Sequence, residues 1–201
     1  MTEHDGAATL IARVKNILLK PGEEWERIDA EPTTIGDICR RYVLPLAAVP
    51  AIAGLIGALA FGYSAFGFSY RPSVGAALTS AIVQYGMALI SVFVLMLIID
   101  ALAPSFQATP DRTRAFKVAA YSYTASWVAG ILGILPALAT LGALLGLYSF
   151  YLLYRGLPKL MRAPAEKALS YTVVVVIAAI VVALAIGAVT VPVTGALMGV
   201  F

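Results

Sequence analysis

The feature that most constrains this chain is an uncharged run from Val118 to Tyr154, interrupted by one proline, Pro136. A membrane-spanning helix needs about 20 predominantly apolar residues to cross roughly 30 Å of hydrocarbon. The run is too long for one crossing and long enough for two. It therefore predicts two membrane helices, over 118–135 and 137–154, that meet at Leu135-Pro136.

The rest of the chain has the same character, because 61% of its residues are hydrophobic and only 12% are charged. A soluble domain carries about 25% charged residues. Further apolar runs over 42–61, 77–102 and 171–191 bring the predicted spans to five. The predicted fold class is an all-α membrane protein with five transmembrane helices, preceded by a short cytoplasmic amphipathic helix. It divides the chain into a cytoplasmic N-terminal segment, 1–41, and a five-span transmembrane domain, 42–201.

The positions of lysine and arginine predict how the spans are oriented. Apart from Arg71, all of them lie before the first span, after the second or after the fourth. Segments rich in lysine and arginine stay on the cytoplasmic side of a membrane. The N-terminus is therefore predicted to be cytoplasmic and the C-terminus external, in a bacterial cytoplasmic (inner) membrane. The net charge of +3 then reflects topology and contact with anionic lipid at the cytoplasmic face, not nucleic-acid binding.

Residues 9–20 place apolar side chains at spacings of three and four, with cations between them. This pattern is typical of a short helix that lies in the plane of a membrane surface. The predicted membrane-surface anchor consists of Leu10, Arg13, Val14, Lys15, Ile17, Leu18 and Trp25. Packing of the same face on the protein's own cytoplasmic loops is the alternative that the pattern leaves open. After Glu31-Pro32, Thr34 is predicted to cap a short helical turn into the first span.

Small residues recur at helical spacing in three of the predicted spans. In membrane helices such residues let neighbouring backbones approach closely. They are Pro50, Gly54, Ala58 and Gly62 in the first span, Gly142 and Gly146 in the fourth, and Ala179, Ala183 and Gly187 in the fifth.

The sequence offers little material for catalysis. Its one histidine, His4, lies in the polar terminus, so the paired histidines of an HExxH zinc site are missing. Its one cysteine, Cys39, excludes an internal disulfide. An aspartyl dyad needs two carboxylates, whereas Asp100 is the one acid within an apolar run. We therefore predict a non-enzymatic protein with no catalytic residue, cofactor or metal.

Asp100 is the most informative polar residue, because ionisable groups within spans suggest function by default. Its place near the cytoplasmic end of the second span favours an ion pair with Arg112, Arg114 or Arg155, and proton or ion coupling is the alternative. The predicted functional or structural polar positions are Asp100, Gln84, Tyr121, Arg112, Arg114 and Arg155. A polar path joining Gln84, Tyr121, Ser122, Thr124 and Asp100 would favour transport, whereas a dry interior lined by small residues would favour an adaptor.

Several segments together resemble the bacterial branch of the Yip family, named for eukaryotic members that bind Ypt/Rab GTPases. They are RVKNILLKPGEEWERI, the spacing Asp37…Tyr42…Pro45, RAFKVAAYSYTASWVAGIL and LYSFYLLYRGLPKLMRAPAEKALSYT. The resemblance implies five membrane helices, a cytoplasmic N-terminus and a membrane-organising or adaptor role. Here Asp37 is followed by Ile-Cys-Arg-Arg, unlike the Asp-Leu-Tyr-Gly-Pro type motif of eukaryotic members, so their GTPase binding is not carried over.

The function predicted from the sequence is that of a non-enzymatic integral membrane protein of the Yip type, acting through its cytoplasmic face. Its expected partners are the lipid bilayer with its anionic lipids, and either another membrane protein or a second copy of the chain. The alternative is a small oligomeric transporter or channel for an ion or small solute.

Overall fold

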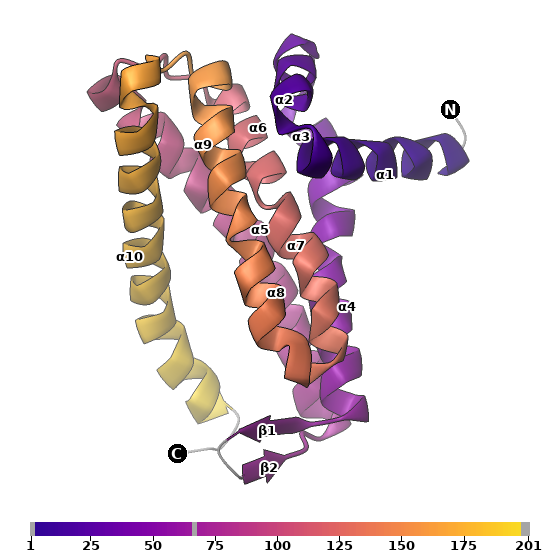
Figure 1. Ribbon diagram of the computed structural model, residues 1–201. Coiled ribbons are helices and arrows are strands. Elements are labelled where there is room, and N and C mark those ends of the chain that lie inside the picture. The colour runs from indigo at the N-terminus through magenta and orange to yellow at the C-terminus, as the bar shows by residue number, and fades with distance from the viewer. Residues whose placement is uncertain (1–2, 66–67, 198–201) are drawn as a thin grey trace.

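The computed structural model describes residues 3–65 and 68–197, with side chains described over 9–62 and 70–185. The described chain is helical apart from one short antiparallel hairpin, in which β1 (Tyr63–Ala65) pairs with β2 (Phe68–Tyr70). Figure 1 shows helices running side by side, with α1 and α2 near one end of the bundle and the hairpin at the other. We refer to these as the α1–α2 end and the hairpin end.

The N-terminal segment forms two helices, α1 (Glu3–Leu19) and α2 (Pro21–Ala30). Pro21 does more than end α1, because it occupies the first position of α2, where its missing N–H is not needed. The predicted cap at Thr34 is confirmed, since its hydroxyl oxygen accepts a hydrogen bond from the Asp37 N–H at 3.2 Å. This cap begins α3 (Ile35–Ile38).

Within the described part of the chain, four helices are long and apolar enough to cross a membrane. The first, Ile35–Ala60, runs through α3, the π-helical turn η1 (Cys39–Val43) and α4 (Leu44–Ala60). The second, Val74–Phe106, joins α5 (Val74–Leu102) to the 3-10 turn η2 (Ala103–Phe106).

The other two candidates follow later in the chain. Pro136–Leu160 joins the 3-10 turn η4 (Pro136–Leu138), α8 (Ala139–Gly146) and α9 (Tyr148–Leu160), and Ala165–Ala185 belongs to α10 (Ala165–Leu197). These helices extend beyond the predicted spans. Arg155 and Lys159 lie within α9, and only residues 161–164 connect α9 to α10.

The predicted third span, 118–135, is not among these four candidates. It falls in α6 (Arg112–Ser122), α7 (Thr124–Ala129) and the 3-10 helix η3 (Gly130–Ile134). The helix breaks at Tyr123 and tightens from Gly130, so no part of it forms a long regular helix. Figure 1 shows α6 and α7 running alongside α9, and every residue of α6 from Ala115 to Ser122 is buried. The α6–α7 part of this segment is therefore the inner element of the bundle.

Close backbone approaches explain why small residues recur in these helices. A Cβ added to Gly130 would stand 2.5 Å from the Cβ of Pro50, so α4 and η3 pack without room for a side chain. A Cβ on Gly142 would lie 3.2 Å from the Ala129 carbonyl oxygen, and one on Gly146 would lie 3.4 Å from the Ser126 hydroxyl. The paired glycines of α8 thus fit it against α7.

The buried core is concentrated toward the α1–α2 end. Its largest fully buried side chains include Trp25, Tyr171, Phe116, Ile17, Ile28 and Leu157. In contrast, η3, η4 and α8 contain no buried residue. Large apolar side chains such as Ile82, Ile177 and Leu184 are exposed along the outside of the bundle, the surface expected of helices that contact lipid.

Candidate functional site

Helix α2 is docked into the bundle through Trp25, which is fully buried. Its ring packs edge-on against Tyr121 of α6, with ring centroids 6.3 Å apart. On α9, a Cβ added to Gly156 would lie 2.8 Å from Cζ2 of Trp25, so only glycine leaves room for the ring. The indole Nε1 has no hydrogen-bond acceptor among the described residues, so packing holds Trp25 in place.

Arg13 of α1 links the two N-terminal helices through the buried carboxylate of Glu24 and the partly exposed carboxylate of Glu31. Its Nη1 lies 2.6 Å from Oε1 of Glu24, and its Nη2 lies 2.5 Å from Oε1 of Glu31. The guanidinium also lies over the ring of Tyr121, 5.9 Å from its centroid. Burial lowers the pKa of Arg13, but the hydrogen bond and charge of Glu31, with Tyr121 and Glu24, outweigh that effect and raise it.

Lys117 of α6 binds the C-terminal end of α2. Its buried Nζ donates hydrogen bonds to the carbonyl oxygens of Ile28 at 2.7 Å and Glu31 at 2.6 Å. The last carbonyls of a helix have no partner within the helix, and a cation there also suits the helix dipole. We call Arg13, Glu24, Trp25, Glu31 and Lys117 the α1–α2 cluster.

Two exposed ion pairs extend this contact along the outer side of α2. Lys159 Nζ lies 2.6 Å from Oε1 of Glu26, and Arg162 Nη2 lies 2.7 Å from Oδ2 of Asp29. The charge and hydrogen bond of Lys159 lower the pKa of Glu26. Because Lys159 lies at the end of α9, these pairs hold α2 to the same helix that receives Trp25.

The structure places most of the predicted anchor residues against the protein itself. Ile17 and Trp25 are fully buried, and Leu10, Val14 and Leu18 pack on the same core. In the structure α1 contacts α2, η1 and α7, whereas the alternative to lipid contact was packing on the cytoplasmic loops. The other side of α1 is exposed and carries Ile11 (67% exposed), Lys15 and Leu19 (69% exposed).

Asp100, at the end of α5, pairs with one of the three candidate arginines. Its Oδ2 lies 3.6 Å from Nε of Arg112. Arg114 instead lies 3.5 Å from Asp111, and Arg155 lies over the ring of Tyr151.

The other predicted polar residues belong to separate environments. The hydroxyls of Tyr42 and Thr124 lie 2.6 Å apart, and Thr124 also donates to the carbonyl oxygen of Tyr121 at 2.6 Å. Gln84 lines a different pocket of about 450 Å³, together with Gly54 and other small residues. Among the described residues, Asp100 lines none of the three pockets found in the bundle.

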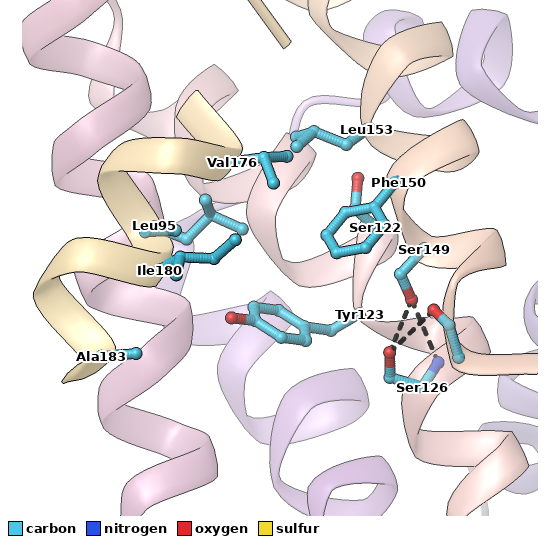
Figure 2. A pocket seen from close by; sticks show the side chains of 12 residues that line it. Leu95, Ser122, Tyr123, Ser126, Ser149, Phe150, Leu153, Val176, Ile180 and Ala183 are labelled. Atoms are coloured by element: carbon cyan, nitrogen blue, oxygen red, sulfur yellow. Dashed lines mark hydrogen bonds between the residues drawn. The ribbon is translucent and has the colours of Figure 1, made fainter. Parts of the chain in front are cut away.

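A pocket between α10 and the inner helices was not predicted from the sequence. It encloses about 260 Å³, and six of its lining residues are Leu95, Ser122, Tyr123, Phe150, Val176 and Ile180. Figure 2 shows these side chains around the opening beside α10. We call it the α10 pocket. Two sequence features could have indicated this pocket. They are the polar residues near the start of the third predicted span, such as Ser122, and the small residues Ala179 and Ala183, which also line it.

The described residues contain no group of three or more histidine, cysteine, aspartate or glutamate side chains that could hold a metal ion.

A family profile of the Yip1 domain matches residues 15–187. This chain belongs to the Yip1 family. The matched range includes Trp25, Lys117 and Gly156, so the family region covers both α2 and the helices that receive it.

Curated relatives agree with this assignment. The chain is 27% identical over 166 residues to the inner membrane protein YohC of Escherichia coli strain K12, covering 81% of this chain and 85% of that protein. The inner membrane protein YohC of Escherichia coli O6:H1 matches to the same extent. No solved structure matches. The family and the apolar helices identify this Yip1 protein as membrane-embedded, similar to a protein of the bacterial inner membrane.

Proposed function

We propose that this Yip1 protein is a non-enzymatic adaptor or membrane-organising protein that acts through the face formed by α1, α2 and the adjoining ends of α6 and α9. The observation that carries this proposal is the α1–α2 cluster. The partly buried ion pairs of Arg13, the hydrogen bonds of Lys117 and the buried Trp25 ring hold the N-terminal helices in one position on the bundle. A partner would therefore meet a preformed surface and would not have to order a free segment.

The proposed topology has five crossings, with the third made by α6, α7 and η3. It places the N-terminal segment, 1–41, and the α1–α2 end in the cytoplasm, and the C-terminus of the 42–201 domain outside. The lysine and arginine distribution supports it, because Arg71 alone would face outward. A broken helix is tolerated inside a membrane protein where neighbouring helices surround it, as they surround α6.

Reporter fusions test this topology. Fusions after Lys20, Lys117 and Ala165 are expected to be cytoplasmic, and fusions after Tyr70 and Phe201 external. A cytoplasmic C-terminus would leave four crossings, so that 118–154 would contribute one crossing and not two.

Exposed cations at the α1–α2 end support contact with anionic lipid. Lys15, Arg40, Arg41 and Arg155 are all exposed there, and each basic residue near an anionic membrane surface contributes about 1 kcal/mol. Native mass spectrometry in equal amounts of phosphatidylglycerol and phosphatidylcholine should show preferential retention of phosphatidylglycerol. Replacing Arg40 and Arg41 with glutamine should reduce that preference, whereas Arg71→Gln, near the hairpin end, should leave it unchanged.

The adaptor role itself is tested by photo-crosslinking in cells from positions 15 and 155. A specific protein adduct is expected in the wild type and should be lost in Trp25→Ala, which releases α2. Equal adducts in both proteins would count against a preformed docking surface.

A transporter is the second candidate, favoured by the pocket of about 450 Å³ that Gln84 lines. If Asp100 is an interfacial ion-pair residue, Asp100→Asn should leave folding intact, because such pairs contribute about 0–1 kcal/mol. A selective loss of proton or ion flux into liposomes, in Asp100→Asn or Gln84→Leu with normal folding, would favour transport.

A further inference from the structure

We propose that the α10 pocket is a binding site for a phospholipid, which places an acyl chain between α9 and α10 and an ester carbonyl at Ser122. The pocket is lined by residues of α5 to α10, and it opens on the outside of the bundle beside Phe150 and Ile180, both of which are exposed. In a membrane-embedded protein that opening faces lipid.

The hydroxyl of Ser122 identifies the kind of ligand. Ser122 is 3% exposed, it lines the pocket, and its Oγ has no hydrogen-bond partner among the described residues. A buried hydroxyl without a partner costs about 1–3 kcal/mol. A plain hydrocarbon chain would leave that hydroxyl unsatisfied. A chain attached to an ester carbonyl would fill the pocket and accept its hydrogen bond.

The neighbouring hydroxyls leave few sites for water. Ser126 and Ser149 already bond to each other at 2.8 Å, and the Ser126 hydroxyl also donates to the Gly146 carbonyl oxygen at 3.2 Å (Figure 2). A buried water needs two to four polar partners. Apart from Tyr123, the remaining side chains that line the pocket, such as Leu95, Leu153 and Val176, are apolar. The lining thus suits a chain with one acceptor better than it suits water.

Small residues of α10 keep the pocket open. Ala179 and Ala183 line it, and they also line a second pocket of about 100 Å³ on the side of Met87 and Ser91. The two pockets share Leu95 and Tyr123 as well, so they adjoin each other beneath α10. A large side chain at position 183 would therefore obstruct both.

Photolabelling of the full-length protein tests the site. The protein is reconstituted in phosphatidylcholine vesicles that contain a small fraction of phosphatidylcholine with a diazirine within one acyl chain. Adducts are then mapped by mass spectrometry. We expect adducts at buried positions around Ser122 and Tyr123, in addition to outward positions such as Leu184. Adducts confined to outward positions would overturn the proposal.

Two variants form a matched pair on α10. Ala183→Phe should remove the adducts inside the pocket and leave those on the outer surface. Ala185→Phe, at an exposed alanine that lines none of the three pockets, should change neither set. Pocket adducts that persist in Ala183→Phe would contradict the site. If Ala183→Phe does not fold, the wild-type adduct map still decides.

Two further experiments test which class of lipid occupies the pocket and whether Ser122 contacts it. A free fatty acid with the same diazirine should not compete with phosphatidylcholine, and labelling by the fatty acid alone would assign the pocket to a different ligand. Ser122→Ala should lower labelling in the pocket while leaving outer adducts unchanged. Unchanged pocket labelling in Ser122→Ala would overturn the carbonyl contact. Adducts between two copies of α10, with no pocket labelling by lipid, would mean that a second chain covers the groove.

Discussion

Helices α6 and α8 both lie in the middle part of the sequence, yet they differ in how far their side chains are buried. Every residue of α6 from Ala115 to Ser122 is buried, whereas α8 contains no buried residue. At the α1–α2 end of the bundle, α6 packs against α2, α5 and α9. The charged side chains of Lys117 and Arg13 bind other protein groups there. Toward the hairpin end, glycines bring α4, η3, α7 and α8 into close backbone contact, and the pocket that Gln84 lines lies among them.

The difference teaches where each part of the molecule obtains its stability. Toward the α1–α2 end, large apolar side chains and buried hydrogen bonds hold protein to protein. At the hairpin end and along α10, the helices rely on close backbone contacts and expose their larger side chains to lipid. Helix association in lipid has no hydrophobic drive of its own and depends on such close packing. The α1–α2 end is thus suited to keep a fixed shape, and the hairpin end is suited to accommodate lipid.

The same substitution at the two ends measures this contrast directly and should give the largest effect. Leu157 of α9 is fully buried, whereas Leu144 of α8 is 59% exposed. Leu157→Ala should lower the free energy of unfolding by about 2–5 kcal/mol, the usual range for a buried leucine. Leu144→Ala should change it by about 0.5 kcal/mol or less. Unfolding is followed by circular dichroism in detergent, and equal losses at both sites would break the comparison.

Two glycines test the same contrast between tightly packed and open parts of the bundle. An added Cβ at Gly156 would meet the rigid ring of Trp25 at 2.8 Å, whereas at Gly86 of α5 it would meet nothing within 4 Å. Gly156→Ala should destabilise the protein by about 1–3 kcal/mol through overpacking. Gly86→Ala should leave stability unchanged or raise it by up to about 1 kcal/mol, because alanine favours the helix. A stable Gly156→Ala protein whose tryptophan fluorescence is unchanged would show that Trp25 is not held by this contact.

Much of the fold could be predicted from the sequence, because hydropathy sets where membrane helices occur. The cap at Thr34 was also predicted, since it depends on a few neighbouring residues. The lengths of α9 and α10 were not, because Arg155 and Lys159 suggested a loop although their charged heads can leave a helix near the membrane surface. The break at Tyr123 depends on how α7 packs, which sequence periodicity does not reveal.

Some contacts of the candidate site could likewise be predicted from the sequence, and others could not. An arginine partner for Asp100 was among the alternatives, and the geometry identifies Arg112. The capping of α2 by Lys117 joins residues 86 or more positions apart, and nothing local in the sequence indicates it. Trp25 was predicted to contact a surface, but the glycine at position 156 that receives it belongs to a different helix.

Lys117 provides the third test, at the boundary between the N-terminal helices and the bundle. Lys117→Met keeps most of the side-chain volume and removes both hydrogen bonds to the carbonyl oxygens at the end of α2. Hydrogen bonds to charged groups contribute about 1.5–3 kcal/mol, but burial of the ammonium opposes them, so a net loss of about 1–2 kcal/mol is expected. Trypsin should then cleave faster after Arg27. Lys15→Met, at an exposed position of α1, is the control and should leave that cleavage rate unchanged.

The smallest effect is expected from the exposed pair of Glu26 and Lys159, and its pH dependence separates it from the buried contacts. Lys159 lowers the pKa of Glu26 in the folded protein below its value in the unfolded chain. A carboxyl with a lowered folded pKa contributes stability above its unfolded pKa, and that contribution disappears as pH falls through the folded value. Exposed pairs are also weakened by salt. The difference in thermal midpoint between wild type and Lys159→Gln should therefore be small at neutral pH, persist in mildly acidic buffer, vanish once the pH falls below the ordinary glutamate value of 4.5 and through the lowered folded pKa, and shrink in high salt. Arg40→Gln, at an exposed arginine of η1, is the control and should show no such pH dependence. A difference that persists at low pH would mean that Lys159 stabilises α2 through packing of its methylene chain and not through its charge.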